Sequence, residues 1–200
     1  MVINPGTIVP LLEALRLTLE IIKQIGPIMM AFAKSLGLVN EKENIGDLGD
    51  KAIQAEEAGI KPEEYETFQD YVNAIESFSV DENKSISIGD ERKHTKGLEI
   101  LTCLLIEKLP KAPIVDLIAL VSAYPKLFTL NAIVKLGKIV SNDPSIIEVV
   151  VKYMKGELNN DELIKKALDV IGLMLKEENP NISEEEVYKE AWKYKSKGVE

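Results

Sequence analysis

Four residues near the middle of the chain have the spacing of a metal-binding helix. Glu91-Arg92-Lys93-His94 places a carboxylate and an imidazole three positions apart, on one face of a helix. Two-metal sites in helical bundles use this Glu-x-x-His pair twice, with two more carboxylates. The chain has one histidine and one such pair, so a metal-dependent enzyme would need a dimer interface. The nearby Arg92, Lys93 and Lys96 would repel a cation, and a solvated helical turn is the simpler interpretation.

Other reactive residues fail on spacing. His94 and Cys103 are nine positions apart on a predicted helix, about 13.5 Å in rise and about 180° in rotation, so they cannot form a nucleophile pair. Residues 81–92 begin like a calcium loop. Ile86 stands where the turn needs glycine, and Arg92 stands where the bidentate glutamate belongs.

A glycine pair suggests a phosphate loop but carries the wrong charges. Gly46-Asp47-Leu48-Gly49-Asp50 places carboxylates where phosphate oxygens would lie, and no Gly-Lys-Ser/Thr follows. We therefore expect no catalytic residue, no cofactor-binding residue and no metal ligand set within one chain.

The net charge points away from nucleic acid. The 200 residues include 24 Lys+Arg and 33 Asp+Glu, a formal net charge of −9, whereas nucleic-acid binders need a clustered basic face. Residues 41–91 hold 15 acidic residues and 4 lysines, a net charge of −11, while residues 1–40 and 92–200 each sum to +1. Almost all of the negative charge lies in one quarter of the chain.

The elements that position these residues are predicted to be helical throughout. Apolar residues recur at helical spacing between Gly and Pro boundaries, and Ser85–Ile88 is the one strand candidate. We expect an all-α fold, an irregular bundle of about seven to nine helices without a significant sheet. The final helix begins with a Ser183/Glu186 capping box, and we expect it to dock through the side chains of Val187, Tyr188, Ala191 and Trp192.

Charge and hydropathy divide this predicted bundle into three segments of one compact unit. Residues 1–40 form an apolar N-terminal helical segment kinked at Gly26-Pro27, residues 41–91 an acidic helical segment, and residues 92–200 the main bundle.

The longest uncharged run near the N-terminus, Gln24–Ala33, has ten residues. A membrane span needs about 20. We expect no membrane span, and the absence of a leader pattern favours the cytoplasm.

The acidic segment is the best candidate for a functional surface. Carboxylates surround the Gly59–Lys61 turn, and a stripe of aromatic residues follows it. The function predicted from this pattern is a non-enzymatic protein-interaction module, such as an adaptor, inhibitor or immunity-type protein, that engages a basic protein partner. Its predicted partner-binding residues are Glu56, Glu57, Glu63, Glu64, Glu66, Tyr65 and Tyr71.

The apolar N-terminal segment supports an alternative function. Its many large side chains need a protein surface to cover them, in this chain or in a second copy. A structural subunit that self-associates as a homodimer is therefore the second hypothesis, and the metal-dependent enzyme at a dimer interface is the third. The predicted self-association residues are Leu11, Leu15, Leu19, Ile22 and Met29.

Overall fold

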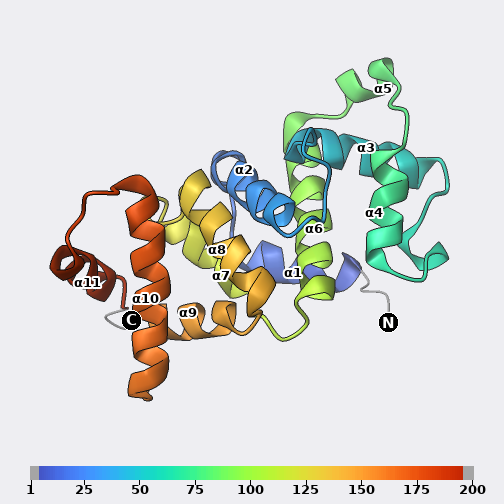
Figure 1. The fold of residues 1–200 in the computed structure, drawn as a ribbon. Coiled ribbons are helices and arrows are strands. Elements are labelled where there is room, and N and C mark those ends of the chain that lie inside the picture. The colour runs from blue at the N-terminus through green and yellow to red at the C-terminus, as the bar shows by residue number, and fades with distance from the viewer. Residues whose placement is uncertain (1–4, 196–200) are drawn as a thin grey trace. The chain divides into compact units, whose positions relative to one another are not determined.

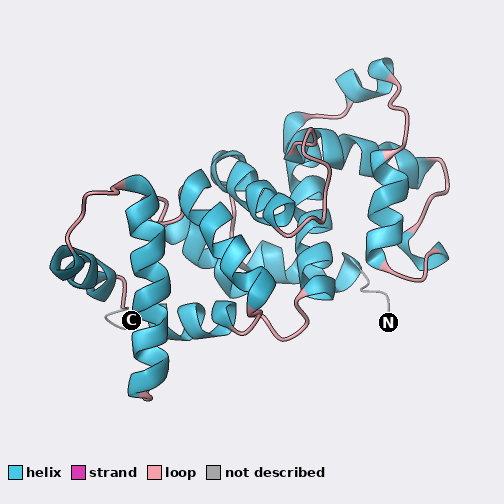
Figure 2. Ribbon diagram, viewed as in Figure 1, coloured by secondary structure: helices cyan, strands magenta, loops and turns pink. Residues whose placement is uncertain are grey.

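Helices make up all the regular secondary structure of residues 5–195, the part of the chain that the computed structural model describes (Figure 2). The all-α prediction is confirmed, with about 71% of the structure in helices. The described residues form eleven α-helices and one 3-10 turn, more than the seven to nine expected. None of these helices is long and apolar enough to cross a membrane.

The chain divides into two compact units, Met1–Pro110 and Lys111–Glu200, where the charge pattern suggested three segments of one unit. The N-terminal unit holds α1 (Pro5–Ala14), α2 (Leu19–Ser35), α3 (Ile45–Glu57), η1 (Pro62–Glu64), α4 (Phe68–Glu76), α5 (Glu82–Ser87) and α6 (Asp90–Lys108). The C-terminal unit holds α7 (Ile114–Ala123), α8 (Leu130–Asn142), α9 (Ile146–Met154), α10 (Asp161–Glu178) and α11 (Glu184–Lys193).

One helix forms the centre of each unit (Figure 1). In the N-terminal unit, α6 packs against α1, α2, α3 and α4. In the C-terminal unit, α10 packs against α8, α9 and α11. The acidic segment is thus not a separate layer, because α3 and α4 contribute buried side chains to the same core as α6.

Two glycines allow α3 and α6 to meet backbone to backbone. A Cβ atom added at Gly49 would lie 1.8 Å from the Lys93 carbonyl oxygen, and one at Gly97 would lie 2.0 Å from the Ile45 carbonyl oxygen. No side chain fits at either position. The Gly46–Gly49 pair, which resembles part of a phosphate loop in the sequence, therefore serves in part as a helix-packing surface.

The N-terminal helical segment breaks earlier than predicted. The interruption falls between α1 and α2, where Arg16 has a φ of 51° and Thr18 caps α2 by accepting a hydrogen bond from the Ile21 amide at 3.4 Å. The α-helix then continues through Gly26 and Pro27. A Cβ at Gly26 would lie 2.8 Å from Ile45 Cδ1, so this glycine provides room for α3.

Two further segments form short helical elements. Pro62 begins only the 3-10 turn η1, and α4 begins after Thr67, whose side chain accepts a hydrogen bond from the Asp70 amide at 3.1 Å. The strand candidate Ser85–Ile88 lies mostly in the short helix α5, which Asp81 caps. Such short helices explain why the predicted number was low.

Candidate functional site

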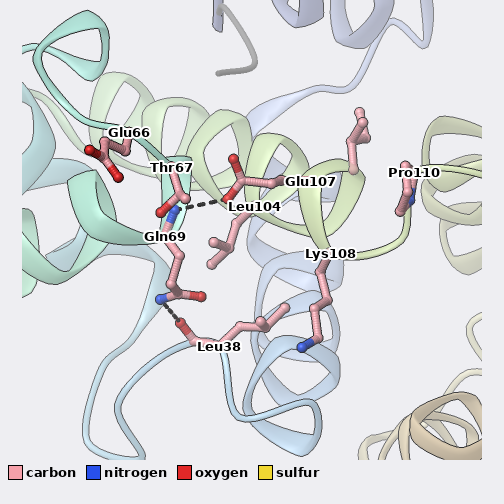
Figure 3. Close-up of a pocket in the computed structure, with 9 residues that line it drawn as sticks. Leu38, Glu66, Thr67, Gln69, Leu104, Glu107, Lys108 and Pro110 are labelled. Carbon is pink, nitrogen blue, oxygen red and sulfur yellow. Dashed lines mark hydrogen bonds between the residues drawn. The ribbon is translucent and has the colours of Figure 1, made fainter. Parts of the chain in front are cut away.

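A pocket of about 690 Å³ lies in the N-terminal unit, between the start of α4, the end of α6 and the loop after α2 (Figure 3). Its apolar floor comes from buried Leu38 and Leu104 and half-buried Ile106. Because it lies within the acidic half of the chain, we call it the acidic pocket. It is lined by Leu38, Glu66, Thr67, Gln69, Leu104, Ile106, Glu107, Lys108 and Pro110.

The wall of the acidic pocket is fixed by a carboxylate from α6. Glu107 Oε1 accepts a hydrogen bond from the Phe68 amide at 2.7 Å, and its Oε2 accepts one from the Gln69 amide at 3.0 Å. A helix N-terminus is a natural anion site, and here the protein's own carboxylate occupies it. The pocket therefore offers no free helix-end amides to an external anion at this wall.

The side chain of Gln69 braces the other side of the pocket. Its Nε2 donates to the Leu38 carbonyl oxygen at 2.9 Å and to Asn73 Oδ1 at 3.1 Å. Figure 3 shows Glu66 and Lys108 at opposite ends of the pocket. The pocket thus has an apolar floor, an acidic end and one basic end.

Glu66, at the acidic end, belongs to a group of four exposed carboxylates that are close in sequence, which we call the acidic rim: Glu63, Glu64, Glu66 and Asp70. Glu64 accepts a hydrogen bond from the Lys61 amide at 3.4 Å, and Asp70 accepts one from the Thr67 hydroxyl at 2.6 Å. Within residues 5–195, no lysine or arginine forms an ion pair with any of the four. The rim therefore presents negative charge that the fold leaves uncompensated.

Of the predicted partner-binding residues, Tyr71 faces the interior, and half-buried Glu56 accepts a hydrogen bond from it. Tyr71 is fully buried, and its hydroxyl donates to Glu56 Oε1 at 2.8 Å. Lys96 Nζ lies 2.8 Å from the same oxygen and 3.7 Å from Glu99. Burial, followed by the charge of Glu56, raises the pKa of Tyr71 well above its usual value. Tyr71 cannot contact a partner in this fold, because its ring lies inside the core.

The remaining predicted residues are distributed over the same corner. Glu57 is exposed and lies 3.7 Å from Lys84 Nζ. Tyr65 is half-buried, and its ring packs against that of Tyr71 with 5.8 Å between centroids. Glu63 and Glu66 are therefore the two predicted carboxylates that have neither an ion pair nor a capping role.

The predicted self-association residues divide between core and surface. Met29 and Ile22 are buried, and Leu15 and Leu19 are half-buried. Leu11 alone is largely exposed, at 48%. The structure thus covers Ile22 and Met29 within this chain, which is one of the two expected ways of burying the set, and leaves Leu11 on the surface.

A second polar network fastens α5 to α3 and α6. Asp50 is buried and accepts hydrogen bonds from Ser85 and from Gln54 Nε2, while Lys93 Nζ lies 2.9 Å from its Oδ2. Burial alone would raise the pKa of Asp50, but these donors outweigh it and hold the pKa below its usual value. Lys93 also donates to Ser85 Oγ at 2.8 Å.

His94 and Cys103, which both lie in α6, have different environments. His94 Nδ1 lies 2.8 Å from the Asp90 carbonyl oxygen, in the same turn of α6, and Glu91 is exposed. Burial, followed by the charge of Glu99, raises the pKa of the Cys103 thiol to about 12. Among the described residues, no three His, Cys, Asp or Glu side chains are arranged to hold a metal ion.

Several lining residues of the acidic pocket were not predicted from the sequence. Leu38 comes from the loop after α2, Gln69 from α4, and Glu107 and Lys108 from α6, and only the fold brings these three elements together. One signal was available, because Thr67 followed by Asp70 is a helix-start pattern that places the beginning of α4 at the pocket. Comparisons of the chain with protein-family models, curated protein sequences and solved structures find no match.

Proposed function

We propose that the chain is a non-enzymatic protein-interaction module whose acidic pocket binds a basic segment of a protein partner. One observation carries the proposal: the exposed carboxylate of Glu66, which forms no ion pair among the described residues, lines a pocket with an apolar floor. Clustered like charges weaken a fold through mutual repulsion. Packing does not require the rim, because its side chains are exposed.

The chemistry of the pocket defines the segment that would fit. A lysine or arginine has a long apolar stem and a charged end, so its stem can lie on the Leu38–Leu104 floor while the charge meets Glu66. An adjacent apolar side chain of the segment can fill the rest of the floor. Charge complementarity of this kind raises association rates and selects the partner.

The experiment is a titration of the full chain against a fluorescent synthetic peptide that alternates arginine with leucine and tryptophan. We expect binding that weakens with salt, because the screening length falls from about 10 Å at 0.1 M to about 3 Å at 1 M. Each exposed ion pair is worth about 0.2–1 kcal/mol, and reversing a charge also adds repulsion. The double variant Glu63→Lys, Glu66→Lys should therefore bind about tenfold more weakly.

A matched control separates the pocket from the overall charge. The variant Glu20→Lys, Glu41→Lys changes the net charge of the same unit equally, and both residues are exposed. It should bind the peptide within about twofold of the unchanged chain. Equal weakening in both variants, with helical circular dichroism intact, would show nonspecific attraction and refute the pocket.

A further inference from the structure

The acidic pocket carries one basic side chain, at the end opposite Glu66. Lys108 is exposed in the last turn of α6, and it is the one basic residue among the described residues that line the pocket. No carboxylate in the described part of the chain lies within ion-pair distance of it. Figure 3 shows the side chains of Leu38 and Leu104 between Glu66 and Lys108. The pocket therefore has one unpaired charge of each sign, with apolar side chains between them.

The other polar side chains of the pocket are bound within the chain. Both carboxylate oxygens of Glu107 accept backbone amides at the start of α4, and the amide group of Gln69 donates two hydrogen bonds. The Thr67 hydroxyl donates to the Asp70 carboxylate and accepts from the Asp70 amide. A ligand in the pocket would therefore rely on the two end charges to pair its own charged groups.

A segment with positive charge only would match one of those two ends. Its cationic group can meet Glu66, but the same charge is repelled by the Lys108 ammonium group. A carboxylate on the segment replaces that repulsion with attraction, and hydrogen bonds between ionised partners are about twice as strong as neutral ones. The ligand that matches the pocket thus carries a cation and a carboxylate, separated by an apolar group.

The end of a polypeptide supplies the apolar group and the carboxylate in one residue. A C-terminal residue holds its side chain and its α-carboxylate on the same Cα atom, and an α-carboxyl pKa of about 3.3–3.7 keeps the group ionised at neutral pH. An internal segment must carry its backbone onward across the apolar floor, where unpaired amide groups cost free energy. The pocket volume of about 690 Å³ also suits a short chain end, because pockets of about 300–1,000 Å³ enclose ligands of that size.

We propose that the basic segment bound by the acidic pocket is the free C-terminus of the partner protein. The last side chain of the partner is apolar and lies on the Leu38–Leu104 floor, its α-carboxylate pairs with Lys108, and a preceding arginine or lysine pairs with Glu66. This inference rests on the proposed function and names the part of the partner that is recognised. Lys108 is then the residue that distinguishes a chain end from other basic segments.

Two forms of the fluorescent arginine peptide test the inference, both labelled at the N-terminus and both ending in leucine. One form has a free C-terminal carboxylate, and the other has a C-terminal amide. The net charge of −9 would by itself favour the amide, because the amide form lacks one negative charge. Contact with Lys108 predicts the opposite order. The free acid should bind about fivefold more tightly at low salt, the upper end of what an exposed ion pair provides.

Substitutions on α6 locate the effect. Lys108→Gln should abolish the preference for the acid, and Lys108→Glu should reverse it, so that the amide binds more tightly. Arg92→Gln is the matched control, because it removes an exposed positive charge from the same helix, about 24 Å from Lys108 along the helix axis. It should keep the fivefold preference. Both residues are exposed, so circular dichroism should show all three variants folded.

A third peptide identifies the source of the carboxylate. It is amidated and has a glutamate after the final leucine, so that its carboxylate belongs to a side chain. It should bind no more tightly than the amidated leucine peptide, and binding as tight as that of the free acid would overturn the assignment to a C-terminus.

The two proposals fail in different ways. Equal binding of acid and amide, tighter binding of the amide, or a preference for the acid that survives Lys108→Gln overturns this inference and leaves the proposed function standing. If neither form binds the unchanged chain, the proposed function is overturned as well.

Discussion

Gly49→Ala should destabilise the N-terminal unit, because α3 and α6 touch through their backbones. The added Cβ would lie 1.8 Å from the Lys93 carbonyl oxygen, and Cβ atoms essentially never come within 3.0 Å of another heavy atom. The two helices would have to separate by about 1.2 Å. The obstacle is backbone, so no side-chain rotation relieves it.

The magnitude follows from two opposing effects. Overpacking a core costs about 1–3 kcal/mol, and a backbone clash falls at the upper end of that range. Alanine is favoured over glycine within a helix by about 1 kcal/mol. The free energy of unfolding should therefore fall by about 2 kcal/mol.

Gly46→Ala on the same helix is the matched control. Its Cβ would lie 3.3 Å from His94 Cε1, an imidazole that can shift by a few tenths of an ångström. The helical preference for alanine should then leave its stability within about 1 kcal/mol of the unchanged chain. Urea unfolding followed by circular dichroism measures both variants. Equal stability of Gly49→Ala and Gly46→Ala would refute the close crossing of α3 and α6.

Three further predictions concern buried polar groups. Because the pKa of Asp50 is lowered in the folded chain, its contribution to stability is present above the ordinary carboxyl range and is lost as the pH falls through that lowered pKa. In urea unfolding, the stability of Asp50→Asn should therefore depend less on acid pH than that of the unchanged chain. Equal dependence would contradict this prediction. Tyr71→Phe removes the 2.8 Å hydrogen bond to Glu56 and should cost about 1.5–3 kcal/mol, since the acceptor is charged; no loss in urea unfolding would place that hydroxyl in water. The Cys103 thiol is fully buried, and burial, followed by the charge of Glu99, raises its pKa to about 12. It should therefore react with a thiol reagent at pH 8 only after unfolding. Rapid reaction of the folded chain would contradict the burial.

Much of the helical pattern follows from local sequence. The Gly and Pro boundaries seen in the sequence fall at helix limits: Gly89 precedes α6, Pro113 precedes α7, and Gly156 follows α9. The reason is that helix ends are set by neighbouring residues: Thr129 and Asn160 cap α8 and α10 through side-chain hydrogen bonds, and Ser183 with Glu186 forms the predicted capping box. Local rules were sufficient at these ends.

Local rules failed where tertiary contacts decide the conformation. The Gly26-Pro27 pair predicts a kink, yet the α-helix α2 continues through both residues, and the missing side chain of Gly26 leaves room for Ile45 of α3. The break falls instead at Arg16, a residue type that rarely has positive φ. A local signal lies two residues later at Thr18, because threonine is a favoured N-cap residue.

The candidate site was only partly predictable for the same reason. The concentration of carboxylates near residues 56–66 was visible in the sequence, but the internal neutralisation of Glu56 by Lys96 depends on the packing of α3 against α6. The Glu107 carboxylate caps α4 from 39 residues away, a distance at which no spacing rule applies. The pocket that gives the acidic rim its proposed role exists only in the folded unit.

Photocrosslinking tests the proposed pocket most directly. The arginine peptide, with a photoreactive diazirine in place of one leucine, is irradiated with the unchanged chain, and the crosslinked residues are identified by mass spectrometry. Binding in the acidic pocket predicts crosslinks to Leu38, to residues 66–69 and to residues 104–110, which disappear when Glu63 and Glu66 are replaced by lysine. Crosslinks that fall elsewhere, or that persist unchanged in the reversed variant, would contradict the account.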